Sequence, residues 1–362
     1  MSIQIIKSNT TCFNNIDWSN LRFGVYFSDH MFVSNYENGK WDDGKIIPYG
    51  DLRVQAANCT LHYGQAIFEG LKAFSSVKGG VNLFRPDMNA KRLASSSRHL
   101  CIPPYNEDKL VDAMIELVKV DSRFIPQKRG ESLYLRPFVF GTGNFLGVTA
   151  SKEYKLVIIT SPVASYYAEG LSPVKIMVEN EHVRAVRGGL GSAKTAANYA
   201  ASMLAAHKAH EKGYSQVLWL DGITRKYIDE VGAMNIMVII GDELITPTLE
   251  RGAILPGVTR NSVLTLAREW GMKVSEREIS IDEIYEAYKN GNLKEMFGTG
   301  TAAVISPVGL LHYNGHDMII NDMRIGETTK KFYDYITSIQ YGEIEDTRDW
   351  IVHIKMKEQV SV

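Results

Sequence analysis

The feature that most constrains the fold of this chain is the order of strand-like and helix-like segments along its sequence. In the first half, two helix-like stretches, Met88–His99 and Glu107–Val120, stand among runs of β-branched and aromatic residues. These strand-like runs are Val81–Phe84, Leu133–Val139 and Tyr154–Thr160. A chain that mixes the two periodicities throughout is predicted to form an α/β fold of packed sheets and helices.

The second half continues this mixture and adds short strands joined by tight turns. A helix is predicted from about Thr195 to Lys212, because Gly213 is a favoured residue just beyond a helix end. A second helix is predicted over Pro256–Trp270, where apolar residues recur on one face. The predicted strands are Val174–Glu179, Gln216–Leu220, Lys226–Asp229 and Asn235–Ile240, and the turns at Asp221–Gly222 and Gly241–Asp242 are typical of an antiparallel meander.

The length of 362 residues allows two domains, each with its own core. Over residues 161–174, Pro, Ser, Tyr and Gly replace the periodic hydrophobicity, which predicts an interdomain linker. We therefore expect an N-terminal α/β domain over residues 1–160 and a C-terminal domain over residues 175–362.

Composition and charge exclude several classes of function. The formal net charge is −1, so the chain lacks the basic surplus that binding to nucleic acid or an acidic membrane requires. No apolar run is long enough to span a membrane, and the N-terminus does not resemble a signal peptide. The cysteines, Cys12, Cys59 and Cys101, have no CxxC spacing and predict neither a disulfide framework nor a zinc site. We expect a cytoplasmic protein without a metal site.

Lys194 is the strongest candidate for a chemical role. It follows the glycine-rich run Arg187–Ala193 and precedes an Ala-rich helix, and no charged residue lies within five positions on either side. A lysine among small, uncharged residues is a candidate Schiff-base former, because a flat ring can approach it closely. Taken alone, the same pattern also fits a solvated lysine in a loop.

Four further features suit a phosphorylated, electron-withdrawing ring cofactor. Glu230, in Glu230–Asn235, offers a carboxylate to a protonated ring nitrogen, although it also fits a strand end in solvent. Gly252–Arg260 leads into a predicted helix whose N-terminal N–H groups would attract a phosphate. The same residues are equally typical of an ordinary loop-to-helix junction that binds nothing. Gly298–Ala303 supplies small and hydroxyl side chains at a bend that is also compatible with a plain tight turn.

The fourth feature is Arg92, whose planar guanidinium suits a phosphate. This signal is weak in isolation, because Arg85, Lys91 and Arg98 stand nearby with equal claims.

Together, in order and spacing, these segments resemble the branched-chain aminotransferases among the fold type IV pyridoxal-phosphate enzymes. The resemblance runs from about Phe23 to Gly342, and its most specific parts are Phe68–Phe74, Tyr134–Pro137, the Lys194 run, Glu230–Asn235 and Ile254–Arg260. It implies a two-domain α/β fold with a smaller N-terminal domain and a larger C-terminal domain that contains an antiparallel, barrel-like sheet.

The resemblance also implies roles for individual residues. Lys194 would form the internal aldimine with pyridoxal 5'-phosphate and move the substrate proton, Tyr199 would face the phenolic oxygen, and Glu230 the ring nitrogen. The phosphate would be held by Arg92, the backbone of Val258 and Thr259, and Thr301. Substrate would be bound by an aromatic box and a carboxylate-binding loop, comprising Phe23, Tyr63, Phe68, Tyr134, Thr301 and Ala302, with Arg136 for a distal carboxylate.

The activity implied is a ping-pong transfer of the amino group of L-leucine, L-isoleucine or L-valine to 2-oxoglutarate, by a homodimer. The alternative is a pyridoxal-phosphate lyase of the same fold, similar to aminodeoxychorismate lyase. Two departures are visible. Ala303 and Ser306 stand where some animal relatives carry a CxxC pair, and Ala233 replaces a threonine that some relatives have beside Glu-Val-Gly.

Overall fold

The computed structural model describes residues 3–164 and 171–356. The chain divides into two compact units rather than into two consecutive domains. The first unit is Met1–Tyr166, Lys194–Ala196 and Ser338–Val362, and the second is Tyr167–Ala193 and Ala197–Thr337.

The first unit is built on a ten-stranded sheet in the order β1-β4-β2-β9-β8-β6-β7-β19, with β3 beside β2 and β5 beside β8. Its strands are β1 (Gln4–Ile5), β2 (His30–Glu37), β3 (Lys40–Trp41), β4 (Lys45–Pro48), β5 (Ala66–Phe68), β6 (Leu71–Ser75), β7 (Val81–Phe84), β8 (Ser132–Gly141), β9 (Tyr154–Val163) and β19 (Ile351–Ile354). Its helices are α1 (Cys59–Tyr63), α2 (Pro86–His99) and α3 (Glu107–Val120), with 3-10 turns at Phe13–Asn15 and Ser122–Phe124.

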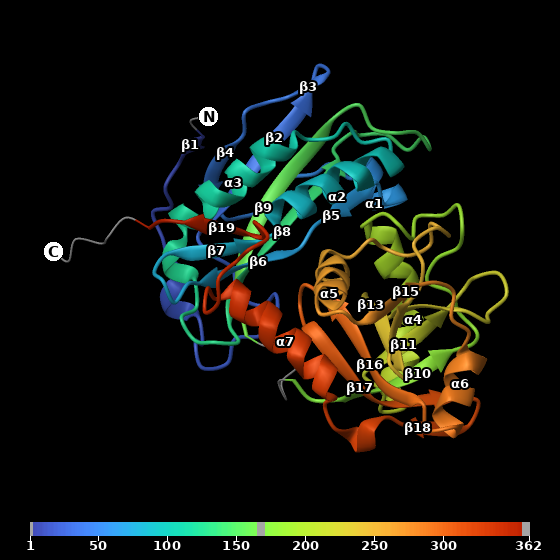
Figure 1. The fold of residues 1–362 in the computed structure, drawn as a ribbon. Coiled ribbons are helices and arrows are strands. Elements are labelled where there is room, and N and C mark those ends of the chain that lie inside the picture. The colour runs from blue at the N-terminus through green and yellow to red at the C-terminus, as the bar shows by residue number, and fades with distance from the viewer. Residues whose placement is uncertain (1–2, 165–170, 357–362) are drawn as a thin grey trace. The chain divides into compact units, whose positions relative to one another are not determined.

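Helices α2 and α3 lie on one face of this sheet (Figure 1). Helix α3 begins after Asn106, whose side chain accepts a hydrogen bond from the Lys109 N–H at 2.9 Å and so caps the helix. Its apolar stripe, which includes Leu110, Met114 and Leu117, is fully buried in the core. The side chains of β8 alternate between the two faces of the sheet. Every second residue therefore joins this core, and those between them point to the opposite face.

The second unit contains a nine-stranded sheet in which β12 pairs with both β11 and β13, so that β12-β11-β10-β17-β16-β13 form a closed, barrel-like ring. Its strands are β10 (Val174–Glu179), β11 (Gln216–Leu220), β12 (Ile228–Val231), β13 (Met234–Ile240), β14 (Glu243–Thr246), β15 (Lys273–Glu276), β16 (Leu293–Gly300), β17 (Val304–Tyr313) and β18 (His316–Ile319). Its helical elements are α4 (Ala196–Glu211), α5 (Val258–Glu269), α6 (Ile281–Lys289), α7 (Glu327–Gln340) and a 3-10 turn at Asn321–Met323.

The ring is not wholly antiparallel. Strand β10 pairs in parallel with both β11 and β17. The cause is α4, which carries the chain from the end of β10 back to the start of β11, as a crossover between parallel strands must. The meander predicted for the strands that follow is confirmed, because β11, β12, β13 and β14 pair in antiparallel fashion.

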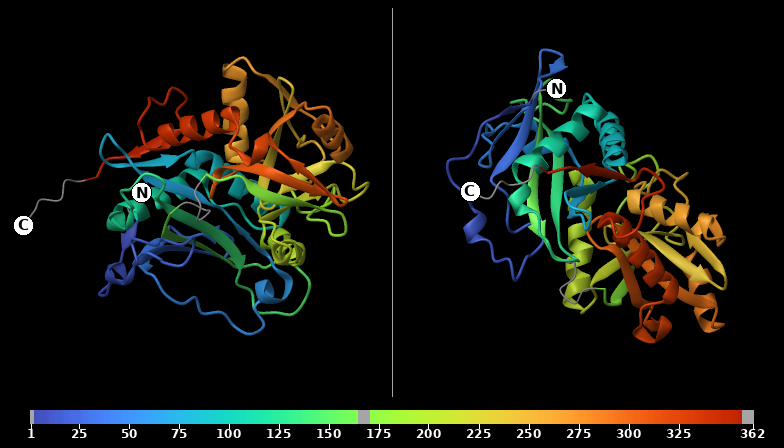
Figure 2. Two further views of the ribbon diagram at one scale, coloured as in Figure 1. Left: turned by 90° about the horizontal axis from the view of Figure 1, so that it is seen from below. Right: turned by 60° about the vertical axis from the view of Figure 1, so that its left-hand side comes forward.

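The boundaries of the units differ from the domain boundaries expected from sequence. Strand β19 pairs antiparallel with β7, and this pairing returns the C-terminal residues from 338 onward to the first unit (Figure 2). The first unit is consequently the larger one, contrary to the expected order of sizes. Of the predicted linker, residues 161–163 end β9, residues 165–170 lie outside the described part of the chain, and β10 starts at Val174.

The helices predicted over Met88–His99, Glu107–Val120 and Thr195–Lys212 are confirmed to within two residues at each end, as is most of Pro256–Trp270. The predicted strands are present as well, although the one predicted over Lys226–Asp229 lies at Ile228–Val231. Several strands were not predicted, among them β2, β3, β4, β14, β15, β17, β18 and β19. Within the described ranges, no helix combines the length and the apolar character needed to cross a membrane.

Candidate active site

Lys194 is held in the first unit through its backbone. Its N–H donates to Ser96 Oγ at 2.9 Å, and its carbonyl accepts from the Phe68 N–H at 2.9 Å. The next residue, Thr195, forms a β-bridge and donates its hydroxyl to Ala66 O at 2.8 Å. These bonds fix the chain direction at Lys194, and its Nζ lies 4.8 Å from the centre of the Phe68 ring. The amine is therefore placed against an aromatic wall.

A buried ion pair lies in the same unit. Glu69, which is fully buried, accepts from Arg92 Nε at 2.8 Å and from Arg92 Nη2 at 2.9 Å. Asn89 donates to the same carboxylate at 2.7 Å. Burial by itself would raise the pKa of Glu69, but Arg92 above all, with Lys194 and Asn89, lowers it below its ordinary value. Arg92 thus neutralises a buried anion, and its predicted contact with a phosphate stays a prediction.

Three of the four predicted wall residues gather around Arg136 on one face of the first sheet. Arg136 Nη2 donates to the Tyr134 hydroxyl at 3.0 Å, and the guanidinium carbon lies 4.6 Å from the centre of the Phe68 ring. Phe23 packs edge-on against Tyr134 with ring centres 4.9 Å apart. Among the described residues, Arg136 Nε is buried without a hydrogen-bond partner. The cluster is therefore apolar and aromatic, with one half-buried cation at its edge.

Tyr63, the fourth predicted wall residue, is not part of this cluster in the described contacts. Its side chain is exposed, and its hydroxyl donates to the carbonyl of Leu146.

Close packing against Tyr134 explains why the Phe68–Phe74 motif has a glycine at position 70. A Cβ at Gly70 would lie 1.9 Å from the Tyr134 hydroxyl, so a side chain there would displace the tyrosine.

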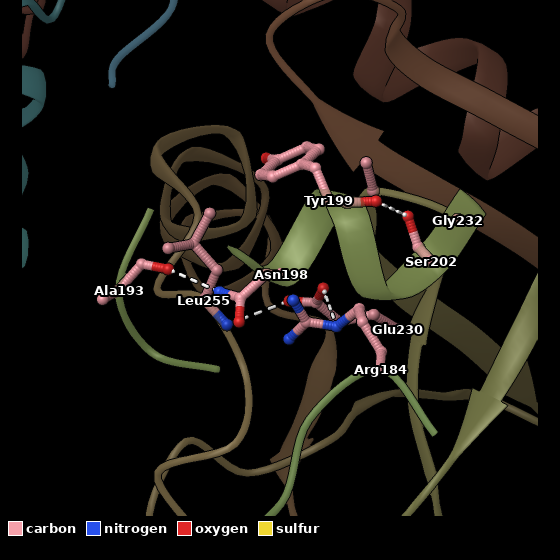
Figure 3. A pocket seen from close by; sticks show the side chains of 9 residues that line it. Arg184, Ala193, Asn198, Tyr199, Ser202, Glu230, Gly232 and Leu255 are labelled. Atoms are coloured by element: carbon pink, nitrogen blue, oxygen red, sulfur yellow. Dashed lines mark hydrogen bonds and ion pairs between the residues drawn. The ribbon is translucent and has the colours of Figure 1, made fainter. Parts of the chain in front are cut away.

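In the second unit, Glu230 lies on β12 and is surrounded by donors (Figure 3). Its Oε1 accepts from the Leu255 N–H at 2.9 Å and from the Asn235 side chain at 3.3 Å. Arg184 Nε lies 3.0 Å from Oε2, an ion pair whose angle is not that of a hydrogen bond. The side chain is almost wholly buried. The strand-end glutamate in solvent, the alternative interpretation of this position, is therefore excluded.

Glu230 borders a pocket, and Tyr199 on α4 borders it too (Figure 3). Asn198, next to Tyr199, donates to the carbonyls of Leu190 and Ala193, both at 2.8 Å, and so fixes the loop that precedes Lys194. The pocket is lined by Arg184, Ala193, Asn198, Tyr199, Ser202, Glu230, Gly232, Ala233 and Leu255. Ala193, one of its walls, directly precedes Lys194 in the sequence.

The predicted phosphate segment is a helix N-terminus. Helix α5 begins at Val258 after Gly257, so the N–H groups of Val258 and Thr259 belong to its first turn, where no carbonyl within the helix can accept from them. A Cβ at Gly257 would lie 2.0 Å from Asn235 Oδ1. Glycine is thus required where this loop passes the side chain that supports Glu230.

The predicted carboxylate loop is the turn between β16 and β17. Thr301 and Ala302 are half-buried there, and the pairing of Gly300 with Val304 closes the hairpin. Val304 has φ of 62°, a left-handed conformation that is strained for a β-branched residue. Strain of this kind persists only where the surrounding structure imposes it, and it is concentrated at binding sites and switches.

Two residues beside Glu230 were missed by the sequence analysis. Arg184 is far from Glu230 in sequence, and no local pattern connects them. Asp229 precedes Glu230 directly and is buried, and one of its carboxylate oxygens has no hydrogen-bond partner among the described residues. Burial raises the pKa of Asp229 to about 7. The only sequence signal for it was the presence of two consecutive carboxylates.

Known proteins agree with this architecture. Residues 66–311 match the family described as amino-transferase class IV. Branched-chain-amino-acid aminotransferase 2 of Bacillus subtilis (strain 168) is 53% identical over 339 residues, which are 93% of each chain. The structure of the Escherichia coli branched-chain amino acid aminotransferase matches with a TM-score of 0.74 and 27% identity, over 90% of this chain and 99% of that one. The PLP (holo) form of the Thermobaculum terrenum enzyme matches with a TM-score of 0.75 and 25% identity, over 91% and 99%. The chain therefore belongs to the class IV aminotransferases, in the family of the branched-chain-amino-acid aminotransferases.

Proposed function

We propose that this aminotransferase moves the amino group of L-leucine, L-isoleucine or L-valine to 2-oxoglutarate, with pyridoxal 5'-phosphate as its cofactor and Lys194 as the cofactor's attachment point. The observation that carries the proposal is the placement of Lys194. Its backbone is fixed, its amine lies against the Phe68 ring, and it follows directly on Ala193, a wall of the Glu230 pocket.

The residues present fit the cofactor. The Glu230 carboxylate suits a protonated ring nitrogen, and the Tyr199 side chain borders the same pocket. The first-turn N–H groups of Val258 and Thr259 suit a phosphate, and Gly257 leaves no side chain to obstruct it. When bound, pyridoxal phosphate supplies an aldehyde that bonds to amines and a ring that withdraws electrons from the substrate carbon. The known holo form of the Thermobaculum terrenum enzyme supports this assignment.

Lys194 is then the acid and base of the reaction. Its amine takes the proton from the substrate Cα and returns it when the new amino acid forms. The hydrogen bonds that its backbone N–H donates to Ser96 and its carbonyl accepts from Phe68 limit the motion of the residue to its own side chain. Such positioning favours proton transfer, because little conformational freedom is lost when the amine reaches the substrate carbon.

Substrate choice follows from the cluster around Arg136. Phe23, Phe68 and Tyr134 offer an apolar surface, and burial of a Leu- or Val-sized side chain there contributes about 1.5–3 kcal/mol. The Arg136 guanidinium, whose Nε has no hydrogen-bond partner among the described residues, suits the distal carboxylate of 2-oxoglutarate. Thr301 and Ala302, in the strained turn before Val304, are proposed to receive the α-carboxylate.

We further propose that the chain forms a homodimer. In the first unit, Leu61, Leu146 and Val148 are exposed, with Val148 at 87%. In the second unit, α4 exposes Met203 and Leu204. Large exposed apolar side chains of this kind are typical of protein interfaces. Sedimentation of the wild-type chain and of Met203→Glu tests this, and a wild-type monomer at micromolar concentration contradicts it.

The first experiment follows the visible absorbance of the purified protein. Addition of L-leucine should replace the visible band of the bound cofactor by that of its amino form, and 2-oxoglutarate should restore it. In Lys194→Ala the cycle should be abolished, whereas Lys91→Ala, which removes an exposed lysine paired with Asp87, should behave as wild type. Turnover by Lys194→Ala near the wild-type rate contradicts the assignment of Lys194.

The second experiment separates the two substrates. Arg136→Met should lower kcat/KM for 2-oxoglutarate on the order of 100-fold, because a charged hydrogen bond contributes about 1.5–3 kcal/mol. The value for leucine should change only a few-fold, since leucine has no distal carboxylate. Equal losses for both substrates would assign Arg136 to the structure of the cluster and not to specificity.

A further inference from the structure

A second cavity lies within the first unit, apart from the residues of the candidate active site. It is an open pocket lined by the turn that connects β6 to β7, by β7, by the end of α7 and its following loop, and by β19. Its volume is about 180 Å³. For comparison, an apolar cavity of roughly 150 Å³ accepts a molecule of the size of benzene. The space therefore suits a ligand of about the size of one amino acid.

One wall of this cavity is aliphatic. It consists of Ile339 at the end of α7, Ile344 in the following loop and Ile351 at the start of β19. Gly342 also lines the cavity and has φ of 72°. A Cβ there would lie 2.9 Å from Ser76 Oγ on the other side, so a larger residue would close the space. The wall is suited to a branched or short aliphatic chain.

Polar side chains also line the cavity, and the orientation of two of them is fixed. Asn82 donates its amide to Gln340 O at 3.1 Å, so its Oδ1 is left to accept from His353 Nδ1 at 2.8 Å. This places a proton on Nδ1 and leaves Nε2 of His353 without a hydrogen-bond partner among the residues that the structure describes. In the cationic form of the ring Nε2 also carries a proton, and it is this form that can donate to a carboxylate. Lys78, which also lines the cavity, has no ion-pair partner within that same part of the chain.

The remaining polar residue, Asp346, limits the charge that a ligand can carry. Its carboxylate accepts from the backbone N–H groups of Ile351 at 2.7 Å and of Arg348 at 3.1 Å, which fixes it at the cavity wall. Its negative charge opposes a second anionic group on a ligand. A single carboxylate directed at Lys78 and His353 avoids this repulsion.

We propose that this cavity binds a small aliphatic monocarboxylate, with its carboxylate at Lys78 and His353 and its hydrocarbon chain against the three isoleucines. The proposal does not depend on the assignment of the active site. A bound ligand would connect the β6–β7 turn to β19, which pairs with β7 alone among the strands of the described residues. Occupancy would thereby restrain the strand that returns the C-terminal part of the chain to the first unit.

The probe for the test is 4-methylpentanoate, which has neither an amino nor an oxo group and so is not a transamination substrate. Hydrogen exchange is measured on the holoenzyme, with and without the probe, at the backbone amides of Ile351–Ile354. The expected result is slower exchange there, saturating with probe concentration. The neutral amide 4-methylpentanamide should bind at least tenfold more weakly. Acetate should be weaker still, because each buried methylene is worth roughly fourfold in affinity.

The variant that tests the carboxylate contacts combines Lys78→Glu, at an exposed position, with His353→Gln. It should weaken the probe-dependent protection at least tenfold and leave transamination within twofold of wild type. Ile344→Ser, which alters only the aliphatic wall, should weaken the probe but not acetate. Protection that is absent at millimolar probe, or that is equal in wild type and in the double variant, would overturn the proposal, since binding would then be absent or elsewhere.

Discussion

The raised pKa of Asp229 predicts in which direction the stability of the fold changes with pH. Its side chain is 3% exposed, and one carboxylate oxygen lacks a hydrogen-bond partner among the described residues. Burial is the main cause that raises its pKa from 3.8 to about 7. Arg251 and Arg184 oppose the rise, and the neighbouring carboxylates of Glu230 and Asp221 add to it.

The raised pKa makes the stability of the fold depend on pH. Below pH 3.8 the carboxyl is protonated in both states, and its contribution to stability is fully present. Between pH 3.8 and 7 the folded chain holds a proton that the unfolded chain has lost, so the free energy of unfolding falls as pH rises. One pKa unit corresponds to about 1.4 kcal/mol, so the whole loss is on the order of 4 kcal/mol. Roughly 2–3 kcal/mol of this falls between pH 5 and pH 8.

Asp229→Asn removes this loss, because an amide cannot ionise. Urea unfolding at pH 5 and pH 8 should show a variant whose stability relative to wild type rises by roughly 2–3 kcal/mol between the two pH values. The matched control is Asp221→Asn. Although burial alone would raise the pKa of Asp221, bonds from the Thr224, Tyr227 and Lys226 backbones lower it strongly, so this variant should be less stable than wild type at both pH values. If Asp229→Asn follows the wild-type pH dependence, Asp229 ionises normally and the reasoning is refuted.

Two further substitutions test the close contacts of the site. Gly70→Ala should displace the Tyr134 hydroxyl, cost about 1–3 kcal/mol of stability and raise KM for leucine, while Gly50→Ala, which meets no atom within 4 Å, should be neutral in both assays. Arg184→Met leaves the buried Glu230 carboxylate without its cation and should cost about 3–5 kcal/mol in urea unfolding. Adding Glu230→Gln to Arg184→Met should recover part of that loss, and a loss below 1 kcal/mol in the single variant would show that the ion pair is dispensable.

Much of the fold was accessible from sequence because its signals are local. Helix α3 has a capping asparagine, Asn106, and an apolar stripe, and the strands of the second unit are separated by glycine turns. The missed features depend on distant partners. Strand β10 is parallel to its neighbours only because α4 crosses over, and β19 joins the first unit only because β7 offers it an edge. Neither pairing leaves a pattern in the strand itself.

The candidate site divides in the same way. The glycine-rich approach to Lys194 and the helix start after Gly257 are local patterns, and both positions adopt the predicted local structure. Arg92 was chosen for its chemistry and its place in a motif, but its described partner is Glu69. Sequence did not show that Glu69 is fully buried. A buried carboxylate requires a cation, so the tertiary structure, not the motif, decides what this arginine neutralises.

Asp229 and Glu230 show why the rest of the site lay beyond sequence analysis. Both are carboxylates on β12, and strand geometry directs their side chains to opposite faces. Glu230 meets the Asn235 amide across its own hairpin, and the Leu255 N–H and the Arg184 guanidinium, which come from distant parts of the chain. One oxygen of Asp229 meets no such donor among the described residues, and its pKa rises. The same functional group thus becomes a well-supported anion at one position and a titrating acid at the next. The donors that separate the two cases are placed only by the folded barrel.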